Sequence, residues 1–244
     1  MIKITSLYKK YQLETIEIPA LEDVSLQISK GETWGIIGPS QSGKSTLCRI
    51  LGGKEQPTSG VIDWVENTEQ KKDYSQLLRE KKIATLFQDF PILWSKTLEQ
   101  NLSLLFEIHG IKKQSIPRKI QTVLKWVELQ GKAHCYLPQL SGEERQRAAL
   151  ACVLVHRPHV LLCDETRLRV EPTRKKYILE LIRSLQQKQN LTVIYFTYDM
   201  TLVRTYCSHV AVFQHAHLIE KGEVQEVLCH PKADLTKVLL QNNT

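Results

Sequence analysis

Apolar and polar residues follow two different periods along the chain, and these predict strands and helices that succeed one another. Continuous apolar runs of roughly four to eight residues predict buried strands, whereas apolar residues repeated every three or four positions predict helices. The predicted buried strands lie at 32–37, 83–87, 160–163, 191–196 and 210–213. Strands separated by helices are typical of an α/β protein with a mostly parallel sheet, which binds ligands at the carboxyl ends of its strands.

The segments outside these five strands predict further strands, a loop and helices. Residues 20–28 alternate as a half-buried strand does, and a turn at 57–60 precedes a strand at 61–64. Residues 66–82 are polar and predict a loop with a short helix, and the tail from Val224 predicts mostly helix.

A helix-rich block interrupts the strand–helix alternation in the middle of the chain. We expect residues 88–155 to form a helical subdomain, inserted into a core made by 1–87 and 156–244. Residues 1–244 are then a single domain.

One loop carries the strongest chemical signal. It matches the phosphate-binding pattern G-x-x-x-x-G-K-[ST] and follows a predicted strand, with a predicted helix at 45–51 after it. Its residues are Gly38, Pro39, Ser40, Gln41, Ser42, Gly43, Lys44, Ser45 and Thr46. Backbone N–H groups of such a loop surround nucleotide phosphates, and the helix N-terminus favours the anion. We expect Lys44 on the β- and γ-phosphate oxygens and the Ser45 hydroxyl on Mg²⁺.

Two carboxylates end the predicted strand at 160–163. Asp164 and Glu165 follow this apolar run directly. An acidic residue at a strand end that faces a phosphate loop suits Mg²⁺, so we expect Asp164 to hold the metal. Glu165 would then polarise the attacking water; a helix-capping acidic pair is the alternative interpretation.

A second small-residue turn lies at Ser141-Gly142. Ser141 is a predicted helix N-cap with Glu144 as its capping-box partner. The N-terminus of this helix, with its small-residue turn, could also bind the γ-phosphate of a nucleotide held by a second molecule.

Composition narrows the class of protein. The chain is 42% hydrophobic and 24% charged, as ordinary soluble globular proteins are. No apolar run approaches the roughly 18–20 residues needed to cross a bilayer. No apolar segment typical of a signal peptide follows the first residues. We therefore expect a cytoplasmic protein that reaches a membrane only through a partner.

The net charge, the cysteines and the histidines give less information about function than the motifs do. The net charge of +7 suits a protein that binds polyanions, but no basic–aromatic array for nucleic acid is visible. The six cysteines are scattered and predict reduced, mostly buried thiols. His215-Ala-His217 is interpreted as a turn between strands, with metal binding as the alternative.

The order of these motifs resembles that of the ATP-binding cassette (ABC) ATPases, and the resemblance covers the whole chain. The order is the phosphate loop, Gln88 after a strand, Leu140-Ser141-Gly142, and then Asp164-Glu165. More narrowly, the chain is similar to the ATPase subunit of bacterial methionine importers, through residues 1–46, 86–93, 161–165 and 178–182. The resemblance implies a P-loop NTPase fold with a mostly parallel core sheet, an N-terminal antiparallel β part and an inserted helical subdomain.

The resemblance also implies roles for individual residues. Tyr11 falls at the aromatic position that stacks on adenine, and Gln88 at the loop that senses Mg²⁺ and the attacking water. Ser141 and Gly142 fall in the signature that closes over the ATP of the opposite subunit. Residues 90–94 fall where an integral membrane permease subunit docks on the helical subdomain.

Several positions depart from the family pattern. Gln41 replaces a glycine of the phosphate loop, which costs roughly 1–2 kcal/mol if its φ is positive. Glu143 replaces the second glycine of the signature, where its carboxylate would repel a γ-phosphate by about 4 kcal/mol. Tyr198 replaces the histidine that contacts the γ-phosphate, and residues 168–171 replace a small-residue loop that ends in Asp. Arg167 or Arg169 could offset Glu143 across a dimer interface.

We weigh three functions for this sequence. The first is the ATP-hydrolysing subunit of an amino-acid importer of the methionine type, bound at the cytoplasmic face of the inner membrane. It would work with a second ATPase copy or a paralogue, and with hydrolysis slowed by Glu143 and Tyr198. The second is a nucleotide-dependent clamp or regulatory subunit with little hydrolysis. The third, a cassette acting on DNA or ribosomes, is disfavoured because such chains usually carry two cassettes or a long coiled coil.

Overall fold

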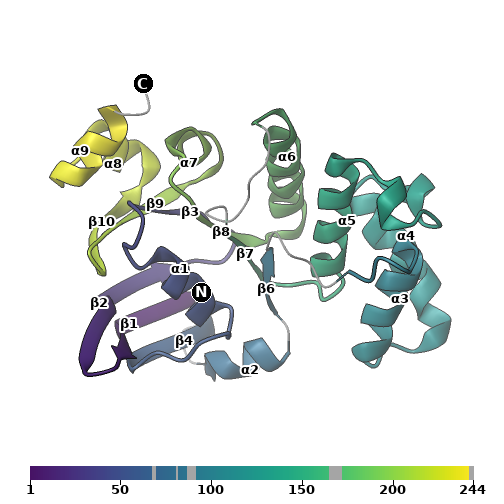
Figure 1. Cartoon of the computed structure of the whole chain (residues 1–244), viewed down its shortest axis with the longest axis horizontal. Coiled ribbons are helices and arrows are strands. Elements are labelled where there is room, and N and C mark those ends of the chain that lie inside the picture. Colours follow the sequence, from purple (N-terminus) through teal and green to yellow (C-terminus); the bar gives the residue numbers. More distant parts are fainter. Residues whose placement is uncertain (68–69, 81, 87–91, 165–171, 242–244) are drawn as a thin grey trace.

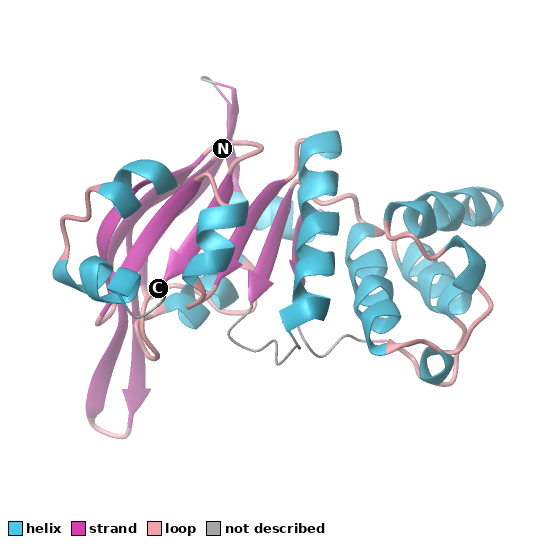
Figure 2. Ribbon diagram, turned by 90° about the horizontal axis from the view of Figure 1, so that it is seen from above, coloured by secondary structure: helices cyan, strands magenta, loops and turns pink. Residues whose placement is uncertain are grey.

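The computed structural model describes residues 1–67, 70–80, 82–86, 92–164 and 172–241 and contains two β-sheets (Figures 1 and 2). The larger sheet has the strand order β10-β9-β3-β8-β7-β6, and its neighbouring strands are parallel except for the antiparallel pair β9 and β10. Its strands are β3 (Thr33–Ile37), β6 (Ile83–Leu86), β7 (Val160–Asp164), β8 (Thr192–Phe196), β9 (His209–Gln214) and β10 (His217–Glu223). The predicted mostly parallel α/β architecture is confirmed.

The smaller sheet is antiparallel and has the order β2-β1-β4-β5. Its strands are β1 (Ile2–Leu13), β2 (Ile16–Ile28), β4 (Ser59–Asn67) and β5 (Gln70–Asp73). The short helix expected within 66–82 is present, but the loop expected beside it is wrong at residues 70–73, where β5 pairs with β4. Backbone pairing at a sheet edge does not require apolar side chains, so hydrophobic pattern alone does not reveal such a strand.

Helices cover the sheets and form a separate group at one end of the molecule (Figures 1 and 2). This group holds α3 (Leu98–Ile108), α4 (Ile116–Trp126) and α5 (Gly142–Leu154), with short 3₁₀ turns at Lys113–Ser115, Gln130–Lys132 and Leu137–Gln139. The other helices are α1 (Lys44–Leu51), α2 (Tyr74–Arg79), α6 (Pro172–Gln189), α7 (Met200–Tyr206), α8 (Val224–Cys229) and α9 (Asp234–Gln241). None of the helices that the structure describes combines the length and hydrophobicity of a membrane span.

The core explains the position of α1. Its residues Leu47, Cys48 and Leu51 are fully buried in one hydrophobic cluster with side chains from both sheets. The helix therefore cannot shift without opening the interface between the sheets, which fixes the loop that precedes it. A second cluster joins α3, α4 and α5 to β7 and α6, and a third packs α7, α8 and α9 on β9.

The parallel strands bring distant parts of the chain to one edge. Ile36 of β3 pairs with Phe196 of β8, and Phe196 pairs with Asp164 of β7. Because these strands run in the same direction, the segments that follow them emerge side by side. The phosphate loop, Asp164 and Tyr198 are therefore gathered by the sheet.

Candidate functional site

The phosphate loop connects β3 to α1 and has a backbone that its sequence must tolerate. Gly43 is the N-cap of α1 with φ of 103°, and a Cβ atom there would lie 2.4 Å from the carbonyl oxygen of Ala20. Only glycine fits this position without displacing β2. Gln41 has φ of 63°, so the positive angle considered for this substitution is present and the associated strain applies.

Lys44 lies inside the loop, with 5% of its surface exposed. Its Nζ donates hydrogen bonds to the carbonyl oxygens of Gly38 and Pro39, both at 2.7 Å, and to Oγ of Ser42 at 3.2 Å. Burial lowers the pKa of Lys44 to about 8, and the charge of Asp164 acts in the opposite direction. A partly desolvated ammonium group in a ring of loop atoms is suited to receive an anion.

Asp164 ends β7 and is buried. Its charge acts on Lys44, although its side chain is not among the described residues that line the adjoining cavity. Glu165, the predicted water-polarising residue, lies outside the described residues, as do Gln88 and the loop at 168–171.

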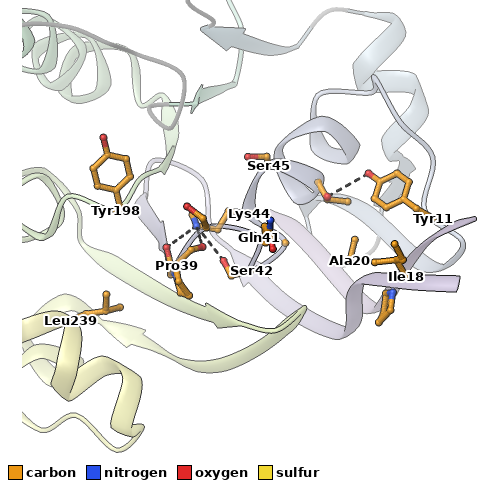
Figure 3. A pocket seen from close by; sticks show the side chains of 15 residues that line it. Tyr11, Ile18, Ala20, Pro39, Gln41, Ser42, Lys44, Ser45, Tyr198 and Leu239 are labelled. Carbon is orange, nitrogen blue, oxygen red and sulfur yellow. Dashed lines mark hydrogen bonds between the residues drawn. The ribbon is translucent and has the colours of Figure 1, made fainter. Parts of the chain in front are cut away.

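An open cavity of about 710 Å³ extends from the phosphate loop toward β1 and β2 (Figure 3). Figure 3 shows Tyr11 and Ile18 at one side, Lys44 near the middle, and Tyr198 and Leu239 at the other side. The lining residues are Tyr11, Ile18, Pro19, Ala20, Gly38, Pro39, Ser40, Gln41, Ser42, Gly43, Lys44, Ser45, Thr46, Tyr198 and Leu239. The structure thus brings the whole predicted phosphate loop and Tyr11 into one cavity.

Tyr11 is held by its hydroxyl group. That oxygen accepts a hydrogen bond from Nη2 of Arg49 at 2.8 Å and lies 3.4 Å from Oγ1 of Thr46. Arg49 also forms an ion pair with Glu55 at 2.9 Å. These contacts tie Tyr11 on β1 to α1, directly after the phosphate loop.

Tyr198 follows β8 at the other side of the cavity and is 67% exposed. The next residue, Asp199, caps α7 by accepting N–H groups of Thr201 and Leu202 and contacts Lys175 at 2.6 Å. Burial alone would raise the pKa of Asp199, but the bonds from Lys175, Leu202 and Thr201 lower it below its ordinary value. Tyr198 therefore directly precedes a hydrogen-bonded helix cap, and most of its side chain is exposed at the cavity.

Ser141 and Gly142 are absent from the described lining of the cavity and lie at the N-terminus of α5. The predicted capping box is confirmed: Oγ of Ser141 accepts the N–H of Glu144, and the N–H of Ser141 donates to Glu144 Oε2 at 2.9 Å. The hydrogen bond from Ser141 lowers the pKa of Glu144, and Lys132 lowers it further.

Of the predicted docking segment at 90–94, only residues 92–94 belong to the described part. Trp94 is 61% exposed, and Leu93 is also exposed. The buried side chain of Asn101 accepts the N–H of Leu93 at 2.8 Å, and its two N–H groups lie within hydrogen-bond distance of the carbonyl oxygens of Leu93, Lys96 and Thr97. The turn is therefore rigid although its apolar side chains face outward.

Some lining residues are not predicted by motif. Ile18 and Ala20 enter the cavity because β2 pairs with β1 beside the loop, and Leu239 enters from α9 near the end of the described chain. Their sequence neighbourhoods carry no chemical pattern. Only the tertiary arrangement identifies them.

Comparison with known proteins agrees with this geometry. Residues 21–167 match the family described as ABC transporter. The chain is 37% identical over 246 aligned residues to "Methionine import ATP-binding protein MetN" of Bacillus subtilis (strain 168), covering 100% of this chain and 72% of the relative. The protein of the same name from Francisella tularensis subsp. holarctica (strain OSU18) is also 37% identical, with 100% and 70% covered.

Solved structures show the same likeness. CbiO1 from Clostridium perfringens, described as part of the ABC transporter complex cbiONQ, superposes with a TM-score of 0.78 at 27% identity, covering 100% of this chain and 98% of that chain. The ATP-binding cassette MJ0796, solved as a dimer bound to ADP and Pi, superposes with a TM-score of 0.74 at 27% identity, covering 92% and 99%. The fold is therefore that of an ATP-binding cassette ATPase.

The chain belongs to the ABC transporter family. The predicted resemblance to methionine-importer ATPase subunits and the predicted fold class are both confirmed.

Proposed function

We propose that the chain is the ATP-binding and ATP-hydrolysing subunit of an importer for methionine or a similar amino acid. The observation that carries this proposal is the buried ammonium group of Lys44, held by the carbonyl groups of Gly38 and Pro39 inside the phosphate loop. A nucleotide phosphate is the anion that fits a cationic loop followed by a helix N-terminus. The named relatives are methionine import ATP-binding proteins, which supports the choice of substrate.

The residues present fit ATP and Mg²⁺. The N–H groups of residues 40–46 and the Lys44 ammonium would hold the phosphates, and Tyr11 would contact the adenine ring. Ser45, Asp164 and Gln88 would hold Mg²⁺, which neutralises phosphate charge when bound. Asp164 suits this role because its carboxylate is buried and a bound cation would compensate the negative charge. The charge of Asp164 also acts on the Lys44 ammonium group, so the two side chains belong to the same electrostatic site. Glu165 would orient and polarise the attacking water.

Hydrolysis in this proposal requires a second subunit. Ser141 and Gly142 lie at the exposed N-terminus of α5, outside the described lining of the chain's own cavity. They are therefore available to a nucleotide held by another ATPase copy or a paralogue. The structural neighbour MJ0796 was solved as a dimer bound to ADP and Pi, which supports a role for a second copy.

A membrane partner completes the proposal. The exposed side chains of Leu93 and Trp94 stand on a rigid turn beside α3, at the helical end of the molecule. We infer that permease subunits dock there, which places the chain at the cytoplasmic face of the inner membrane. The segment 88–155 is in this view a subdomain that transmits movement between permease and nucleotide.

ATP turnover tests the enzymatic part. The purified chain, with and without the membrane subunits of a methionine importer, should hydrolyse ATP only with Mg²⁺. Lys44→Ala should abolish Mg·ATP binding, and Glu165→Gln should retain binding but lose turnover. Absence of Mg·ATP binding by the folded wild-type chain would refute the proposal.

The same assay separates a motor from a nucleotide-dependent clamp. The clamp is favoured by Tyr198, which stands in open space at the cavity edge. If the chain is a clamp, Tyr198→His combined with Glu143→Gly should raise turnover sharply. A wild-type rate within about twofold of that variant would eliminate the clamp.

A further inference from the structure

Two consecutive glutamates stand at the N-terminus of α5, and both have a cationic partner within the same chain. Oε1 of Glu143 lies 3.6 Å from Nη2 of Arg147, one helical turn further on. Oε1 of Glu144 lies 3.0 Å from Nζ of Lys132. The first turn of this helix is therefore less negative than its sequence suggests.

The position of Arg147 does not depend on Glu143. Its Nη1 donates to the carbonyl oxygen of Glu128 at 3.1 Å, and its guanidinium group lies 5.1 Å from the ring centre of Tyr177. The hydroxyl group of Tyr177 in turn donates to the Glu128 carboxylate. With 13% of its side chain exposed, Arg147 is fixed from several sides.

The guanidinium group of Arg147 also has a hydrogen-bond donor that is not used within the described part of the chain. Its buried Nε–H has no acceptor among the described residues. A cation in this setting attracts a nearby carboxylate more strongly than a fully solvated one does. Glu143, four residues before Arg147, is in the favourable order for a helical ion pair.

We propose that Arg147 is a positioning residue that neutralises Glu143 and draws its carboxylate back along α5, so that Ser141 and Gly142 can face the γ-phosphate of a nucleotide bound to a second subunit. The proposal rests on the proposed function, because it concerns the same signature segment. An uncompensated carboxylate at this place would repel the incoming phosphate, as the sequence alone predicts. Arg147 supplies the counter-charge within the subunit.

Glu144 has a different role from Glu143. Its carboxylate is held by the N–H of Ser141 in the capping box, so its place is fixed even without Lys132. Glu143 has no such backbone bond in the described part of the chain. Arg147 is therefore the contact that decides where the Glu143 carboxylate lies.

A double-mutant cycle tests this in the Glu165→Gln background, where ATP is not consumed. Dimer formation with saturating Mg·ATP is measured by analytical ultracentrifugation, and monomer affinity by titration with a fluorescent ATP analogue. Arg147→Gln should weaken dimerisation at least about tenfold, equivalent to about 1.4 kcal/mol. In the Glu143→Gln background, the same substitution should change it by less than about twofold.

Two further measurements separate charge from mere structure. The defect of Arg147→Gln should shrink as salt rises from about 0.05 to 0.5 M, because screening weakens repulsion. Arg147→Lys, which keeps the charge, should recover most of the dimerisation. Arg118→Gln on the exposed surface of α4 loses the same charge and should have no effect.

Another pair of variants leaves Arg147 and its contact with Glu128 intact. Glu143→Asp keeps the charge but shortens the side chain by one methylene group, which weakens its contact with Arg147 and should weaken dimerisation, whereas neutral Glu143→Asn should not. Equal losses from Arg147→Gln in both backgrounds would overturn the proposal. So would equal behaviour of Glu143→Asp and Glu143→Asn, or a chain that binds Mg·ATP yet stays monomeric even with Glu143→Gln.

These outcomes differ from failure of the proposed function. If the folded chain does not bind Mg·ATP as a monomer, the nucleotide-binding proposal itself is wrong. If monomer binding is intact and only the cycle is additive, the role of Arg147 alone is wrong.

Discussion

The ammonium nitrogen of Lys44 lies 2.7 Å from the carbonyl oxygen of Gly38, six positions earlier in the same loop. Burial lowers the pKa of this ammonium group to about 8, so the free protein loses the proton as pH rises through that value. A bound polyphosphate favours the charged form and must restore the proton. We therefore predict that affinity for Mg·ATP falls above about pH 8, by up to about tenfold per pH unit.

Calorimetry in buffers of different ionisation enthalpy measures this directly. At about pH 8, binding should take up about half a proton per nucleotide, and at about pH 6.5 almost none. Lys44→Met, like Lys44→Ala, should show no measurable binding at any pH and no such uptake. An affinity that stays constant between about pH 7 and pH 9.5 would contradict the prediction.

The place and conformation of the candidate phosphate loop follow from the sequence because their determinants are local. The pattern from Gly38 to Ser45 fixes a loop whose neighbours, β3 and α1, also have clear hydrophobic periods. Asp164 follows from the same reasoning, since parallel strands deliver their carboxyl ends to one edge. Local pattern and covalent connection are sufficient at these positions.

Other features depend on contacts between distant segments. Leu239 reaches the cavity only because α9 packs beside β9, and β5 forms only because the edge of β4 accepts it. The partner of Glu143 is an intermediate case. Arg147 has the spacing of a helical ion pair, but its fixation by Glu128 and Tyr177 cannot be inferred from spacing.

Gly43→Ala should disrupt the phosphate loop. With φ of 103° and the new Cβ atom only 2.4 Å from the Ala20 carbonyl oxygen, the variant must strain the loop or displace β2. We expect a loss of about 1–3 kcal/mol in the free energy of unfolding, and no measurable Mg·ATP binding. Urea unfolding and nucleotide titration check the two parts.

Gly131→Ala is the matched control for that variant. Apart from Gly131 itself and its chain neighbours, no heavy atom of the described residues lies within 4 Å of the place that a Cβ atom would take there, and the φ of Gly131 is not positive. It should leave both stability and nucleotide binding close to wild type. Equal effects of the two substitutions would show that the conformation of Gly43 is not what the loop requires.

Asn101→Leu should loosen the turn that presents Leu93 and Trp94. The substitution removes the side-chain partner of the Leu93 N–H and of the Lys96 carbonyl group, at about 1–3 kcal/mol for each group that water cannot reach, while the Leu93 and Thr97 carbonyl groups keep backbone hydrogen bonds. We expect lower stability and weaker stimulation of ATP turnover by permease subunits, with monomer affinity for Mg·ATP preserved. Thermal unfolding and reconstituted ATPase assays measure these effects.

Trp94→Ala provides the comparison for Asn101→Leu. It removes an exposed side chain without disturbing the hydrogen bonds of Asn101, so stability should stay near wild type while permease stimulation falls. If permease stimulation survives both substitutions, the docking surface lies elsewhere on the chain.

Asp199 should stabilise the chain above about pH 4 through its cap and its contact with Lys175. Lys175, Leu202 and Thr201 lower the pKa of Asp199 despite its burial, so its contribution is complete above the unfolded pKa of about 3.9 and disappears as pH falls through the lower folded value. Asp199→Ala should cost about 1–2 kcal/mol in the free energy of unfolding at neutral pH, whereas Asp199→Asn keeps a capping side chain and should cost less than about 1 kcal/mol.

Urea unfolding from about pH 7 to pH 2.5 should show the difference in stability between wild type and Asp199→Ala narrowing only below about pH 4. A difference that stays unchanged throughout that range would mean that the carboxylate charge does not stabilise α7.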